Sequence, residues 1–243
     1  MANPIPVPEG TPVKRTLHFF WLTDYSGSMS GAKIATLNQA IREALPELRQ
    51  AVTAHPEVQI LMRAIKFADS ASWHVGPTAM PLEQFVWPEL RTAGTTATVQ
   101  AIRMLAAELT IENMPRRGYP PVCILVSDGY CTDPPEEYDR AIADLLALPW
   151  GKRAVRLAIA IGEDEANYDE VELLKFVSHQ EIGVLKARNP GELVNYIKWA
   201  SIAATVGSTQ GKTKAGSSRQ DDVFVVLPSP PPQPTPTTNT NLF

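Results

Sequence analysis

Strand-like and helix-like patterns of apolar residues alternate along most of the chain. The runs at 17–22 and 121–126 are apolar almost throughout, which is typical of strands covered on both faces of a sheet. Between such runs, apolar residues recur at spacings of three and four, as in Ile34, Leu37 and Ile41, which predicts amphipathic helices that face a sheet. The alternation predicts an α/β fold, doubly wound, with a mostly parallel central sheet and helices on both faces.

The expected elements follow one another at short intervals. We expect strands at 17–22, 58–67, 72–75, 121–126, 154–161 and 184–185, with 72–75 antiparallel to 58–67. A proline-marked loop is expected at 77–88. Helices are expected after 31, 98, 133, 169 and 189, and the last three begin at acceptor caps, Asp133, Asp169 and Asn189.

Both ends of the chain differ from this pattern. Residues 1–13 carry four prolines and no periodicity, which predicts an extended arm before a domain at 14–206. Residues 207–243 are rich in Ser, Thr and Pro, a composition typical of disordered chain. Within them, 223–227 form an apolar patch for which two interpretations stay open, a partner-binding segment or an inert tail.

Composition narrows the class of protein. The 243 residues carry a formal net charge of −4, so no general attraction to nucleic acid or anionic lipid is expected. No signal-like or membrane-spanning stretch is found, and we expect no membrane insertion. The two cysteines, Cys123 in a strand-like run and Cys131 in a loop, provide neither a disulfide framework nor a zinc quartet, which favours a cytoplasmic setting.

Oxygen-bearing side chains follow three of the predicted strands. Asp24, Ser26 and Ser28 alternate on a strand-to-helix turn, and Thr95 and Asp128 lie on two other loops. Ligand sites of open α/β sheets lie at the carboxyl ends of strands, so we expect these loops to meet. The set contains no His or Cys, and it predicts a site for Mg²⁺, or alternatively Mn²⁺, in preference to zinc.

The order and spacing of these five residues resemble the metal-ion-dependent adhesion site of von Willebrand factor A domains, over roughly residues 14–204. The wording at 26–31, 92–95 and 126–129 is similar to bacterial tellurite-resistance proteins of the TerY type, which are intracellular and associated with stress systems, a phosphatase and a kinase. One departure is Thr96-Ala97-Thr98, where Pro-Leu-Gly is common, and Thr96 competes with Thr95 for the threonine role.

The resemblance implies a binding function. In such domains the serines and the threonine coordinate the metal, the aspartates coordinate it or hold its waters, and one position is left for a partner's carboxylate. We therefore expect a non-enzymatic interaction module in a stress-response or phosphorylation-signalling assembly, with a kinase or phosphatase as a candidate partner.

Other interpretations of the same residues stay open. Asp24 and the serines could form a helix cap, Asp128 an ordinary turn, and Tyr25 and Tyr130 either a ligand rim or packing. Neither a P-loop nor a nucleophile elbow is present, so we expect no catalytic residue. The enzymatic alternative is a metal-dependent phosphohydrolase that uses the same oxygen cluster.

Overall fold

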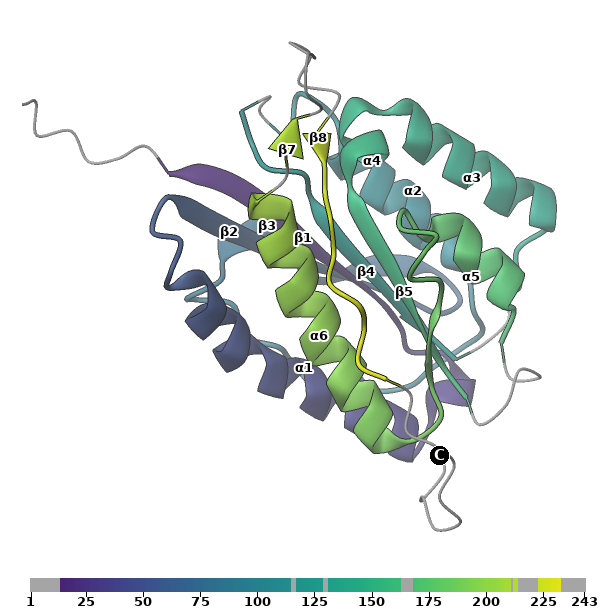
Figure 1. Cartoon of the computed structure of the whole chain (residues 1–243). Helices are drawn as coiled ribbons and strands as arrows, with labels where there is room; N and C mark the ends of the chain where they lie inside the picture. Colours follow the sequence, from purple (N-terminus) through teal and green to yellow (C-terminus); the bar gives the residue numbers. More distant parts are fainter. Residues whose placement is uncertain are drawn as a thin grey trace, which may run out of the picture.

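A six-stranded sheet, in the order β3-β2-β1-β4-β5-β6, forms the centre of the computed structural model (Figure 1). The structure describes residues 14–114, 117–128, 131–162, 168–210, 212–213 and 223–232. All neighbouring strands are parallel except β2 and β3, which are antiparallel. The predicted doubly wound, mostly parallel α/β fold is therefore confirmed.

The bounds of the elements are as follows. The strands are β1 (Arg15–Asp24), β2 (Val58–Phe67), β3 (Ala71–Pro81), β4 (Val122–Ser127), β5 (Val155–Ile161) and β6 (Leu185–Ala187), with a separate two-stranded pair of β7 (Lys212–Thr213) and β8 (Val223–Phe224). The helices are η1 (Gly27–Met29), α1 (Ala32–Val52), α2 (Thr98–Glu108), α3 (Pro135–Ala147), α4 (Pro149–Arg153), α5 (Glu170–Phe176) and α6 (Pro190–Thr209).

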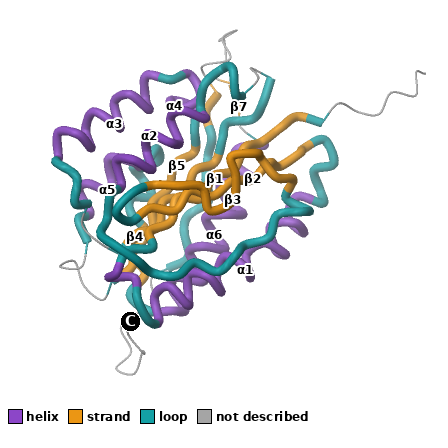
Figure 2. Tube along the Cα trace, turned by 180° about the vertical axis from the view of Figure 1, so that it is seen from behind, coloured by secondary structure: helices purple, strands orange, loops and turns teal. Residues whose placement is uncertain are grey.

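Alternate residues of β1 enter two hydrophobic cores, one on each face of the sheet. Phe19 and Trp21 face the core that α1 and α6 cover, whereas Phe20 and Leu22 face the core that α2, α3, α4 and α5 cover. Figure 2 shows the two helical layers on opposite sides of the strands. Because β1 is buried on both faces, its residues 17–22 are apolar almost throughout, as the sequence predicts.

Two local predictions are wrong. The antiparallel strand β3 continues to Pro81, through residues expected to form a loop, because it pairs with β2 again beyond an irregularity in register. Asp133 does not cap α3, whose cap position is Pro134 and makes no side-chain hydrogen bond. Asp133 Oδ2 instead accepts a 2.9 Å hydrogen bond from the amide of Val99, in the first turn of α2. The caps predicted at Asp169 and Asn189 are confirmed, since each side chain accepts from the amide three residues later.

Part of the C-terminal region folds back onto the domain. Helix α6 extends to Thr209, beyond the expected boundary at 206, and residues 223–232 run beside it (Figure 1). Val225 is only 6% exposed, and its carbonyl lies 2.9 Å from His179 Nε2. The patch at 223–227 is therefore partly packed within this chain. The arm at 1–13 and the tail residues 211, 214–222 and 233–243 lie outside the described residues.

Within the described part of the chain, no helix is both long and apolar enough to cross a membrane.

Candidate metal site

The candidate site begins where β1 ends at the carboxyl edge of the sheet. Asp24 is the last residue of β1, and the 3₁₀ turn η1 follows directly. Gly31 then adopts φ +78°, a left-handed conformation that residues with a side chain rarely adopt, and this turn starts α1. Strand β4 lies beside β1 and ends at Ser127, so Asp128 reaches the same edge.

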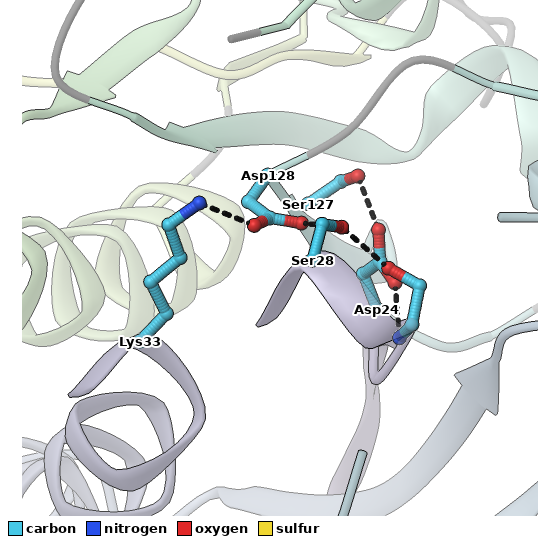
Figure 3. Close-up of polar contacts among 6 residues, drawn as sticks. Asp24, Ser28, Lys33, Ser127 and Asp128 are labelled. Carbon is cyan, nitrogen blue, oxygen red and sulfur yellow. Dashed lines mark hydrogen bonds and ion pairs between the residues drawn. The ribbon is translucent and has the colours of Figure 1, made fainter. Parts of the chain in front are cut away.

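Four of the five predicted residues form one connected cluster (Figure 3). Ser28 Oγ lies 3.0 Å from Ser26 Oγ and donates a 2.8 Å hydrogen bond to Asp128 Oδ1. Asp24 Oδ1 accepts from the Ser26 amide at 2.8 Å. Asp24, Ser26 and Asp128 are buried and Ser28 is exposed, so the cluster reaches solvent at Ser28.

The carboxyl group of Asp24 lies in an unfavourable setting for its negative charge. Burial raises the pKa of Asp24 to about 6, and the negative charge of Asp128 contributes to the rise. Hydrogen bonds from Ser127 and Ser26 act in the opposite direction on this pKa. The Ser127 hydroxyl donates to Asp24 Oδ2 at 2.6 Å. A cation at the cluster would offset the unfavourable burial of this charge.

A cation is in fact present at the cluster, on the side chain of Lys33. Its Nζ lies 2.5 Å from Asp128 Oδ2, while Asp128 Oδ1 accepts from Ser28 (Figure 3). The side chain of Lys33 is 19% exposed and that of Asp128 is fully buried. The ammonium group thus acts as a stand-in cation for the oxygen cluster.

The predicted threonine, Thr95, makes no hydrogen bond to the other four residues in this structure. Its amide and its hydroxyl both donate to Asp69 Oδ1, at 2.7 and 2.8 Å, and the residue is exposed. The loop itself is close, because the Gly27 amide donates to the Gly94 carbonyl at 2.9 Å. Thr96 is 5% exposed, and its carbonyl accepts from Thr132, on the loop that follows Asp128.

Sequence reasoning gave no role to two residues of the cluster, Ser127 and Lys33. Ser127 directly precedes Asp128, and in a strand its side chain points to the opposite face from its neighbours, a signal too general to assign a partner. Lys33 offered a clearer signal, because a lysine in the first turn of a helix is unfavourable to the helix dipole.

The proposed aromatic rim is only partly described. The Lys66 ammonium lies 5.2 Å from the ring centroid of Tyr25. Gly129 and Tyr130 lie outside the described residues.

The donor set fits a hard divalent cation. It consists of oxygen atoms from two carboxylates and two serine hydroxyls, with a threonine on a third, adjacent loop. Oxygen donors in such a mixture suit Mg²⁺ or Mn²⁺. Among the described residues, no three His, Cys, Asp or Glu side chains are grouped closely enough to hold a metal by themselves. The hydroxyls would therefore have to take part.

Comparison with known proteins gives similarity in structure alone. No family model and no curated protein matches the sequence. One similar structure is the ArnB paralog VWA2 from Sulfolobus acidocaldarius, with a TM-score of 0.55, 18% identity, and coverage of 75% of this chain and 44% of that one. Another is proximal thread matrix protein 1 from the mussel byssus, with a TM-score of 0.54, 17% identity, and coverage of 79% and 47%.

A further structure of the mussel protein is described as having a zinc-occupied MIDAS motif, the metal-ion-dependent adhesion site; it matches with a TM-score of 0.54, 14% identity, and coverage of 78% and 46%. This chain spans less than half the length of each of these proteins. At such low identity the similarity concerns the fold. Together with the strand order, it identifies the fold of this chain as that of the von Willebrand factor A domains.

Proposed function

We propose that this chain is a non-enzymatic protein-interaction module that binds a divalent metal at Asp24, Ser26, Ser28, Asp128 and a threonine, Thr95 or Thr96. The metal would capture a carboxylate of a partner protein. The observation that carries the proposal is the connected oxygen cluster, which joins two loops and already holds one cationic group.

The exposure of the cluster suits binding of an outside group. Asp24 and Asp128 are buried, whereas Ser28 is exposed to solvent. With neutral hydroxyls among its ligands, a divalent ion would keep much of its positive charge. Such an ion attracts a further anionic ligand from the open side, and an aspartate or glutamate of a partner has the required chemistry.

We propose Mg²⁺ as the metal, with Mn²⁺ as a second candidate, because both prefer oxygen donors. The zinc in the mussel protein belongs to a site of the same type in that protein. Zinc is therefore included as a comparison in the experiment below.

In the part of the chain that the structure describes, no histidine contacts the cluster to serve as a base for the phosphohydrolase alternative. The four histidines make their contacts elsewhere: His18 with Arg63, His55 with Glu57, His74 with the Pro88 carbonyl, and His179 with Ser178 and the Val225 carbonyl. Hydrolysis with two metals generally uses more carboxylates than Asp24 and Asp128 provide. The binding function requires neither a base nor further carboxylates at the cluster.

The cellular setting that we propose for this chain rests on the amino-acid sequences of its motifs at 26–31, 92–95 and 126–129. The resemblance to tellurite-resistance proteins of the TerY type supports a cytoplasmic stress-response or phosphorylation-signalling assembly, with an associated kinase or phosphatase as the partner. Cys123 and Cys131 are both free thiols, which is compatible with a reducing compartment.

A pull-down from native extract tests the proposal. Wild type, Asp24→Ala and Asp144→Ala, which removes an exposed carboxylate on α3, are compared in Mg²⁺, Mn²⁺, Zn²⁺ and EDTA. We expect one partner retained by wild type and Asp144→Ala in Mg²⁺ or Mn²⁺, and lost in EDTA or on Asp24→Ala. Retention by folded Asp24→Ala, or in EDTA, would contradict the proposal, and so would turnover of a phosphate ester that depends on Asp128.

A further inference from the structure

The ion pair between Lys33 and Asp128 occupies an oxygen atom of the candidate metal site. Lys33 Nζ lies 2.5 Å from Asp128 Oδ2, and the Ser28 hydroxyl binds the other oxygen of the same carboxylate. Both carboxylate oxygens of Asp128 are therefore engaged within the chain. A metal ion that uses Oδ2 has to displace the ammonium group.

The backbone fixes Lys33 in this position. Gly31 makes the left-handed turn into α1, and Lys33 is the second residue of that helix. A lysine here faces the positive end of the helix dipole, and the first turn of α1 contains no acidic residue. The position is unfavourable for a cation unless a nearby anion offsets it, and Asp128 is that anion.

The pair is largely withdrawn from water, so its two charges depend on one another. The Asp128 side chain is fully buried and the Lys33 side chain is 19% exposed. Removal of one partner from a buried pair leaves an uncompensated charge, which is more costly than loss of an exposed pair. Without Lys33, the Asp128 carboxylate would need another cation, and a divalent metal at the same site would supply one.

We propose that the Lys33 ammonium competes with the metal ion for the carboxylate of Asp128. It neutralises Asp128 while no metal is bound, and it thereby sets the metal affinity of the site. The inference rests on the proposed function, because it concerns the same site. Metal loading then requires the ammonium to leave Asp128 Oδ2. The native chain accordingly binds metal more weakly than its oxygen donors alone would allow.

Lys33→Met is the direct test, because methionine keeps an unbranched apolar side chain and removes the charge. Lys33→Gln is a second variant that keeps an N–H donor. Lys66→Met is the matched control, because Lys66 lies near Tyr25 at the same edge, with its ammonium 5.2 Å from the ring centroid. The full chain of each variant is titrated with Mn²⁺, with free Mn²⁺ followed by electron paramagnetic resonance, and its thermal unfolding is measured with and without Mn²⁺.

We expect both Lys33 variants to bind Mn²⁺ at least about tenfold more tightly than wild type does. The affinity of Lys66→Met for Mn²⁺ should differ from that of wild type by less than about twofold. Without metal, Lys33→Met should unfold at a lower temperature than wild type, and Mn²⁺ should raise that temperature more than it does for wild type. A general effect of charge would instead change Lys66→Met by a similar factor, and that result would overturn the inference.

The outcomes separate this inference from the proposed function. Equal or weaker Mn²⁺ binding by folded Lys33 variants, with clear binding by wild type, would overturn the inference and leave the metal site in place. Binding by the Lys33 variants with none by wild type would support the competition and contradict a metal-dependent function of the native chain. Absence of binding in every variant would overturn both.

Discussion

Ser28 and Asp128, 100 residues apart in the sequence, are joined by a 2.8 Å hydrogen bond from the serine hydroxyl to Oδ1 of the aspartate. The bond connects the loop after β1 to the end of β4, two parallel neighbours in the sheet. It brings residues that we expect to hold a metal, from these two loops, next to each other in the folded chain. A preassembled site reduces the ordering that metal binding requires.

Ser28→Ala removes both the bond to Asp128 and a candidate metal ligand. We expect the affinity for Mn²⁺ to fall by about tenfold or more, with little change in unfolding temperature, because Ser28 is exposed. Ser30→Ala is the matched control, since Ser30 is an exposed serine two residues further on. Titration calorimetry of the two variants measures the difference. An equal loss in both would show that the loop, and not the Ser28 hydroxyl, determines the affinity.

Asp24→Asn separates the stability of the site from its function. The raised pKa of Asp24, about 6 against an ordinary value of 3.8, means that the folded protein holds this proton more tightly than the unfolded chain does. The corresponding stability is fully present below about pH 4 and is lost as the pH rises through about 6. Asparagine carries no charge and can still accept from the Ser26 amide.

Without metal, Asp24→Asn should therefore be more stable than wild type by about 1–3 kcal/mol at roughly pH 8, and nearly equal to it at roughly pH 4. Urea unfolding in EDTA at the two pH values measures this. A variant that is less stable than wild type at the higher pH would contradict the buried, unfavourable charge assigned to Asp24.

Two adjacent threonines compete for the fifth position of the site. We expect Thr96→Val to weaken Mn²⁺ binding more than Thr95→Val, because the Thr95 hydroxyl is held by Asp69 at the surface while Thr96 is buried beside the loop that follows Asp128. Valine has nearly the shape of threonine, so packing changes little. The reverse order of effects would assign the ligand to Thr95, as the sequence predicts.

Val225 tests whether the returning C-terminal segment is part of the folded domain. Val225→Ala should lower the free energy of unfolding by about 1–2 kcal/mol, since Val225 is 6% exposed and packs in the core on the α6 side. Val226→Ala, at a position that is 67% exposed, should have an effect below about 0.5 kcal/mol. Similar small effects at both positions would show that the segment does not pack stably.

The alternation of apolar strand patterns and helix patterns along the sequence predicts most of the fold. Because β1, β4 and β5 are buried on both faces, each gives a mostly apolar run, and the helices between them show the period of one apolar face. The sequence also predicts β3, but as a shorter strand than the one observed, because Pro77 suggests that the strand ends there. An edge strand such as β3 tolerates proline and continues through it.

The candidate site was predicted in outline and not in its contacts. The carboxyl ends of parallel strands meet by geometry, so the meeting of Asp24 and Asp128 follows from the topology. Which side chain each carboxylate binds depends on distances between loops, and local sequence does not encode them. Two contacts of this kind are not predicted by the sequence. Asp128 pairs with Lys33, and Asp133 accepts a hydrogen bond from the Val99 amide of α2 and does not cap α3.

Titration of Mn²⁺ into the wild-type chain and Asp24→Ala tests the central claim most directly, namely that these loops form a divalent-metal site. We predict saturable binding of one ion per wild-type chain, and no measurable binding by Asp24→Ala with its circular dichroism spectrum unchanged. Failure of the wild type to bind, or equal binding by the folded variant, would contradict the account.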